Sequence, residues 1–123
     1  MTIDTQQLND VVQSFVTGTL NVQGAALVTA EGLPIVSTLP PGLEESRAAA
    51  MAAAVVGIGD RIGEELQRGT TRHILLEGDH GYSILTLCTS DALFLVLASS
   101  DVKQGVLMLE IKRMVDRLAQ LLA

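Results

Sequence analysis

The sequence has very few aromatic residues. Only 2% of its 123 residues are aromatic, namely Phe15, Tyr82 and Phe94, and tryptophan is absent. Proteins that bind bases or planar cofactors usually stack them on aromatic side chains. The composition therefore argues against recognition by stacking, and we expect no cofactor.

Basic residues are scarce as well. Eight Lys and Arg residues stand against fourteen Asp and Glu residues, which gives a net charge of -6. Apart from Lys112–Arg113, the basic residues are scattered along the chain. Nucleic acids and anionic membrane surfaces both attract clusters of basic residues. We therefore expect neither a nucleic-acid partner nor a membrane partner.

Cysteine and long apolar runs are nearly missing. Cys88 is the only cysteine, so no disulfide can form within the chain, which fits a reducing compartment. The first residues lack the charged and apolar segments of a signal peptide. The most apolar stretch, residues 48–59, is shorter than the roughly 20 residues that cross a bilayer. We expect one cytoplasmic domain over residues 1–123, without membrane insertion.

Periodicity and turn residues predict eight elements. Asp4 is suited to cap a first helix, with Gln7 at the position that completes a capping box. Glycines and prolines separate the later segments. The expected ranges are a helix over 5–18, strands over 24–29 and 33–37, a helix from 44 to 69, strands over 72–77, 82–88 and 92–98, and a helix from about 105.

This order, α-β-β-α-β-β-β-α, predicts the α+β class. Strand 92–98 is so apolar that we expect it in the centre of a sheet, covered on both faces. Pro34 lacks an amide hydrogen and suits an edge strand or a strand start. Two hairpin blocks around a long helix indicate one antiparallel sheet. The middle helix would cross one face and the terminal helices would share the other.

No catalytic or metal-binding pattern is present. The glycines of residues 57–63 are spaced wrongly for a dinucleotide motif and fall inside an expected helix. His73, His80 and Cys88 do not have the spacing of metal ligands. Cys88 lies in an apolar strand, where a buried, unreactive thiol is expected. We therefore predict no enzyme and assign no catalytic, cofactor-binding or metal-binding residues.

The middle helix carries the most informative pattern. A glycine inside a helix costs about 0.5–1 kcal/mol relative to alanine, so several together indicate a packing role. A helical projection gives a bulky stripe of Met51, Val55, Ile58, Ile62 and Leu66. Beside it runs a small-residue stripe of Ala52, Val56, Gly59 and Gly63. The small stripe allows close approach either of this chain's own sheet or loop or of a helix from another molecule.

Three segments resemble the Roadblock (dynein light chain) family, and within it the bacterial MglB-type regulators of Ras-like GTPases. Residues 24–35 look like the family's opening hairpin, with Gly24, Leu27 and Val28 before Gly32 and Pro34. The alanine-rich residues 51–59 are similar to its central helix. Residues 92–97 resemble its last strand.

The resemblance implies a five-stranded antiparallel sheet of order 2-1-5-4-3 and a homodimer formed through the central helix and the third strand. It favours the intermolecular role for the small-residue stripe. The implied dimer contacts are Ala52, Val56, Gly59, Gly63, Arg72, Ile74 and Leu76. The implied contacts with a Ras-like small GTPase are Arg47, Ala54, Arg61 and Glu65.

The implied function is a non-enzymatic module that regulates or positions a small GTPase. Two alternatives stay open. The chain could be a scaffold subunit without a GTPase partner. It could instead be a small-ligand sensor of the profilin-like, PAS or GAF kind, although such pockets usually contain convergent polar or aromatic groups.

Overall fold

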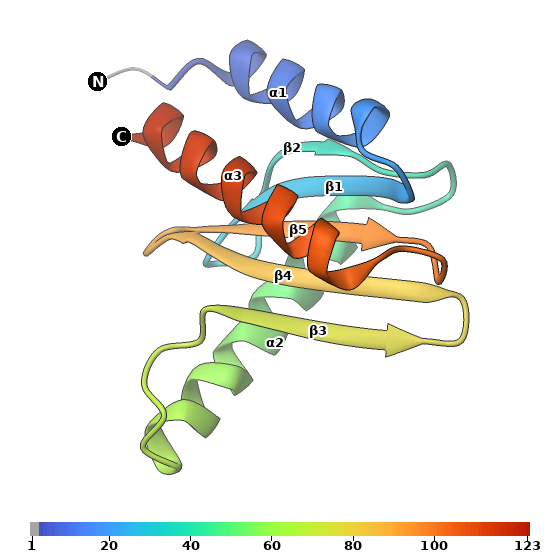
Figure 1. Ribbon diagram of the computed structural model, residues 1–123. Helices are drawn as coiled ribbons and strands as arrows, with labels where there is room; N and C mark the ends of the chain where they lie inside the picture. The colour runs from blue at the N-terminus through green and yellow to red at the C-terminus, as the bar shows by residue number, and fades with distance from the viewer. Residues whose placement is uncertain (1–2) are drawn as a thin grey trace.

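A computed structural model describes residues 3–123 of the chain. It contains three helices and five strands in the predicted order (Figure 1). The elements are α1 (Thr5–Gly18), β1 (Val22–Thr29), β2 (Pro34–Thr38), α2 (Glu45–Glu65), β3 (His73–Gly78), β4 (Gly81–Thr89), β5 (Ala92–Ala98) and α3 (Gln104–Leu122).

Side-chain hydrogen bonds and a glycine determine where α1 begins and where the chain turns between β1 and β2. The Asp4 carboxylate accepts a hydrogen bond from the Gln7 amide at 3.1 Å and so caps α1 as predicted. The turn between β1 and β2 places Gly32 at a φ of +96°, a conformation that other residues rarely adopt. The Thr29 hydroxyl accepts from the Leu33 amide at 3.0 Å and closes the same turn.

The five strands form one antiparallel sheet with the order β2-β1-β5-β4-β3. Strand β5 is central, and every residue of it except Leu97 is buried. The strand that contains Pro34 lies at one edge, and β3 lies at the other. The α+β fold, its strand order and the places of β2 and β5 therefore agree with the predictions.

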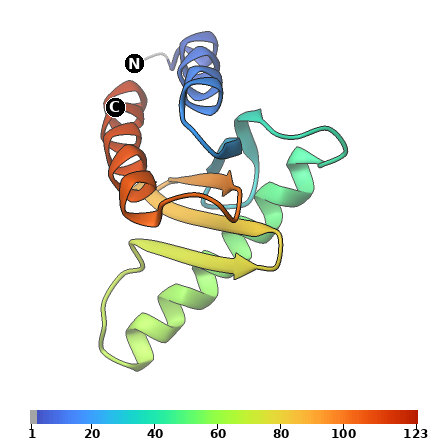
Figure 2. The ribbon, with the colours of Figure 1, turned by 45° about the vertical axis from the view of Figure 1, so that its right-hand side comes forward.

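Two apolar layers cover the two faces of the sheet. Helices α1 and α3 lie on one face and α2 crosses the other, as the turned view in Figure 2 makes clear. The alternation of β5 serves both layers, because Phe94 and Val96 face α1 and α3 whereas Leu93 faces α2. Phe15 meets the Phe94 ring edge to face, with centroids 5.5 Å apart.

Helix α2 ends earlier than predicted. Its last helical residue is Glu65, four residues before Gly69. Gln67 adopts a positive φ of 59°, and the amide of Arg68 then donates to the Gly63 carbonyl at 2.6 Å. This hydrogen bond and that of the Gln67 amide to Glu64 form a Schellman motif, which turns the chain back along the helix.

None of the helices in residues 3–123 is long and apolar enough to cross a membrane. The same residues contain no group of three or more His, Cys, Asp or Glu side chains placed to hold a metal ion.

Candidate functional site

The most conspicuous surface feature is the bulky stripe of α2. Its large side chains lack cover, whereas the side chains of the two apolar layers are enclosed. Isolated exposed apolar residues are common, but an aligned series on one helix marks an interaction surface. The exposed fractions are 58% for Met51, 61% for Ile58, 53% for Ile62 and 60% for Leu66.

The packing of α2 on the sheet explains this exposure. The helix meets the sheet through Ala49 and Ala52, which are buried against the layer that includes Ala26 and Leu95. The small side chains on this face of the helix let it lie close to the strands. The bulky stripe occupies the neighbouring arc, where only Val55 is half-buried. The large side chains of α2 therefore lie beside the contact between helix and sheet, and the sheet does not bury them.

The small-residue stripe of α2 packs closely within this chain. Ala52 is buried under the sheet, and Val56 packs against the same layer. A methyl group on Gly63 would overlap the Gly69 carbonyl, and one on Gly59 would lie 2.8 Å from the Thr71 hydroxyl. The stripe thus fits the chain's own sheet and loop, the first alternative that the sequence leaves open. The expected contact of Ala52, Val56, Gly59 and Gly63 with a second copy stays a prediction.

Strand β3 extends the exposed apolar surface to the edge of the sheet. It pairs with β4 on one side, and within residues 3–123 no strand lies on its other side. Leu76 is 47% exposed, and Ile74 is half-buried against the layer under α2. Arg72, just before the strand, is exposed. The strand positions of the predicted interface therefore remain accessible.

A groove connects the stripe with this edge. It has a volume of about 490 Å³, and Met51 and Val55 of α2 line it together with Leu76 of β3. Leu85 and Leu97, from β4 and β5, also line it, and Arg47 and Glu44 are among its polar lining residues. The bulky stripe, the groove and the β3 edge thus form a connected apolar surface, which we call the α2–β3 surface.

The face of α2 that points away from the sheet consists of charged residues and residues with small side chains. All four residues implied as GTPase contacts lie on it and are exposed: Arg47, Ala54, Arg61 and Glu65. In residues 3–123 the only ion pair joins Glu110 and Arg113 of α3, so these charged groups are not paired within the chain. They are free to meet a partner, whereas the small side chain of Ala54 allows close approach.

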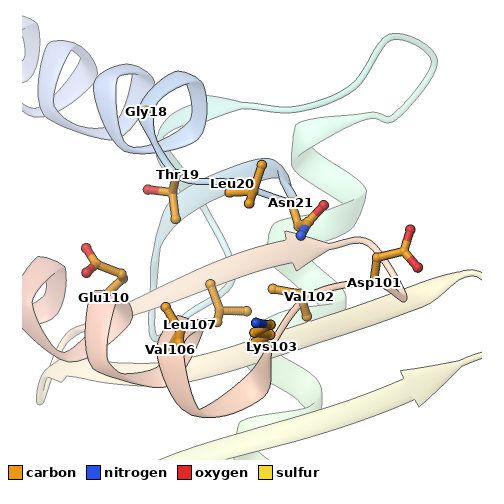
Figure 3. Close-up of a pocket in the computed structure, with 10 residues that line it drawn as sticks. All are labelled: Gly18, Thr19, Leu20, Asn21, Asp101, Val102, Lys103, Val106, Leu107 and Glu110. Atoms are coloured by element: carbon orange, nitrogen blue, oxygen red, sulfur yellow. The ribbon is translucent and has the colours of Figure 1, made fainter.

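A second hollow lies at the other face of the molecule, between the turn after α1 and the start of α3 (Figure 3). Its volume is about 410 Å³. Thr19 and Asn21 lie on one side, and Val106 and Glu110 lie on the other. None of the residues that line it is aromatic, His or Cys, so it offers little of what a small-ligand pocket usually contains.

The sequence matches the Roadblock/LC7 domain family over residues 8–98, from the first turns of α1 to the end of β5. The chain belongs to the Roadblock/LC7 family. Helix α3 lies beyond the matched range and completes the layer on the face opposite α2.

The chain also resembles one further protein in sequence and two solved structures in fold. The uncharacterized protein MJ0310 of Methanocaldococcus jannaschii is 29% identical over 100 residues, covering 81% of this chain and 87% of that protein. A Roadblock/LC7 domain from Streptomyces avermitilis superposes with a TM-score of 0.86 at 20% identity, covering 93% of this chain and 96% of that one. MglB of Myxococcus xanthus superposes with a TM-score of 0.91 at 19% identity, covering 99% and 92%. This chain therefore has the fold of MglB.

The sequence does not single out the bulky stripe as the accessible one. It identifies two stripes on one helix, but a projection cannot tell which of them the sheet covers. The signal that separates them is side-chain size. The inner faces of β1 and β5 near α2 contain Ala26 next to bulky residues, and only a helix face of small residues can approach them closely.

Proposed function

We propose that this Roadblock protein is a non-enzymatic homodimer that regulates or positions a Ras-like small GTPase. The observation that carries the proposal is the α2–β3 surface, which combines four largely exposed apolar side chains of α2 with an unpaired strand edge. The family resemblance supports both the dimer and the GTPase partner.

We propose a second copy of the chain as the partner that covers this surface. Two β3 edges can pair antiparallel about a two-fold axis, so that each edge satisfies the backbone groups of the other. The same axis brings the two bulky stripes together beneath the joined sheets. The proposed dimer contacts are therefore Met51, Ile58, Ile62, Leu66 and Leu76, with Arg72 and Ile74 beside them.

The outward arcs of the two α2 helices would then lie side by side on one surface. We propose that Arg47, Ala54, Arg61 and Glu65 contact the GTPase there. The arc has charges of both signs at its margins and small residues between them, which is suited to a specific protein contact with a polar rim. The GTPase supplies its own catalytic groups, and the dimer holds or rearranges them.

The dimer is tested by placing a charge within the stripe. Ile62→Asp should convert the dimer into a folded monomer, because an aspartate at a buried contact has no partner to neutralise it. Val106→Asp is a matched control, since Val106 of α3 is also apolar and 61% exposed but lies on the opposite face. Light scattering after size-exclusion chromatography measures the mass. A monomeric parent protein, or a dimeric Ile62→Asp variant, would contradict the assignment.

The GTPase partner is tested separately on the dimer. Each Ras-like GTPase encoded in the same genome is loaded with GDP or a GTP analogue and titrated with the protein. Arg61→Glu should weaken binding at least tenfold while the mass of the dimer stays unchanged, because the reversed charge faces the partner. Hydrolysis assays then distinguish activation from positioning. A dimer that binds no GTPase would support the scaffold alternative.

A further inference from the structure

The two halves of α2 have very different surroundings. The first half, up to Val56, packs on β1, β2 and β5. The second half extends beyond the β3 edge of the sheet, as both ribbon views show (Figures 1 and 2). Within residues 57–65 only Gly63 is buried, and a methyl group on Gly57 would meet nothing within 4 Å.

The second half is also a poor helix by composition. It contains Gly57, Gly59 and Gly63, and glycine disfavours helix more than any residue except proline. The β-branched Ile58 and Ile62 add a smaller penalty. The last turn contains Glu64 and Glu65 and no basic residue, so these carboxylates meet the negative end of the helix dipole. The local sequence therefore opposes the helix that the structure contains.

The loop that follows α2 supplies the contacts that hold this half. The Asp60 carboxylate accepts from the Thr71 amide at 3.0 Å. The Arg68 and Gly69 amides both donate to the Gly63 carbonyl, at 2.6 and 3.2 Å. Asp60, Arg68 and Gly69 are exposed and Thr71 is half-buried, and hydrogen bonds near water contribute little net stability. Ile58 and Ile62 remain 61% and 53% exposed, so most of the burial that they could contribute is not realised within the chain.

We propose that the helical order of residues 57–66 is coupled to dimerisation. In the isolated chain this half opens readily, because three glycines and an unfavourable dipole oppose it. In the dimer a second copy covers Ile58, Ile62 and Leu66, and burial of these side chains stabilises the helix. This inference rests on the proposed dimer.

The coupling has a consequence for the GTPase contact. Arg61 and Glu65 lie in residues 57–66, the half of α2 whose helical order depends on the dimer. Arg47 and Ala54 lie on the half that packs on the sheet. The complete contact surface is therefore present only in the dimer. Dissociation would remove the GTPase site without unfolding the sheet, which makes protein concentration a regulator of partner binding.

Hydrogen exchange measured by mass spectrometry tests the coupling. Peptides from residues 57–66 should exchange about tenfold faster in a Leu76→Asp monomer, whose substitution lies on β3 outside this segment, than in the dimer, as expected for local opening. Peptides from residues 46–56 should change by less than about twofold, because the sheet protects them in both states. Val106→Asp should retain the protection of the dimer in both segments.

Gly57→Ala provides a second variant that does not touch the proposed interface. Its methyl group meets no other atom, and alanine favours helix over glycine by an amount equivalent to about fivefold in an equilibrium constant. Introduced into the Leu76→Asp monomer, it should slow exchange of residues 57–66 by up to about fivefold.

The outcomes separate the two proposals. If the parent protein is a dimer and residues 57–66 exchange equally slowly in dimer and monomer, the coupling is wrong and the dimer stands. If sedimentation shows a monomer at every concentration, both proposals fail. Uniform loss of protection in Leu76→Asp, including the central strand β5, would mean global unfolding. Dilution of the parent protein below its dissociation constant then supplies the monomer for the same comparison.

Discussion

Cys88 illustrates how burial decides the chemistry of one side chain. It lies on β4, half-buried against α3, and its Sγ donates weakly to the Val115 carbonyl at 3.5 Å. Loss of solvent, and to a smaller extent the negative charge of Asp116, raises the pKa of the thiol from 9.0 to about 11. The nucleophile is the thiolate, so the thiol of the folded protein is unreactive at neutral pH.

This pKa predicts slow thiol chemistry in the native protein. At pH 8, Cys88 should react with Ellman's reagent about 100-fold more slowly than the same residue in urea, because the thiolate fraction falls by that factor. As the only cysteine it gives the whole absorbance signal. The neutral thiol favours the fold below pH 9.0, and this contribution is lost as pH rises toward about 11. A native rate equal to the rate in urea would contradict the burial of this thiol.

Helix α2 does not end at the glycine that its sequence predicts as the end. A glycine commonly occupies the left-handed position that ends a helix, and the sequence predicts Gly69 for that position. The structure puts Gln67 there instead, with a φ of 59°. Gly69 is left to make a second turn, also at a positive φ, and its carbonyl packs against Gly63. The close helix–loop contact therefore outweighs the local preference.

Gln67→Gly should stabilise the protein although glycine usually destabilises. Glycine adopts a positive φ without the cost of about 1 kcal/mol that a side chain imposes, so the free energy of unfolding should rise by about that amount. Urea denaturation measures it. Gln120→Gly serves as the control, because Gln120 lies within helix α3 and the same change should lower stability there. Destabilisation by Gln67→Gly would show that its side chain has a role beyond the turn.

The sequence predicts the elements better than the surfaces between them. Alternating and helical periods fix the order of the eight elements, and the continuous apolar run of β5 indicates its central place. Which stripe of α2 meets the sheet depends on packing between distant segments, such as Ala52 in the same layer as Ala26 and Gly63 against Gly69. No local pattern encodes these contacts. The candidate site therefore emerges only when the packed helix leaves its bulky residues exposed.

At the scale of the whole molecule, the two edges of the sheet differ. Strand β2 is short, begins at Pro34 and contacts α1 and the start of α2. Strand β3 lies at the opposite edge, and five of its six residues are exposed. Proteins usually protect an exposed apolar edge, because it otherwise invites pairing with another chain. A second copy at β3 would provide that protection and bury the α2 stripe in the same step.

If dimerisation contributes to the stability of the fold, thermal unfolding depends on protein concentration. Mass action should raise the unfolding midpoint of the parent protein by about 3 °C for each tenfold rise in concentration, given the unfolding entropy of two chains of this size. The Ile62→Asp variant should unfold at a lower midpoint that does not change with concentration, since a monomer has no association equilibrium. Calorimetry over a hundredfold range of concentration measures both. Val106→Asp should follow the parent protein, because its charge lies on the α3 face. Superimposable midpoints of the parent protein across that range would mean that the α2–β3 surface stays uncovered, and the exposed stripe would then need a different partner.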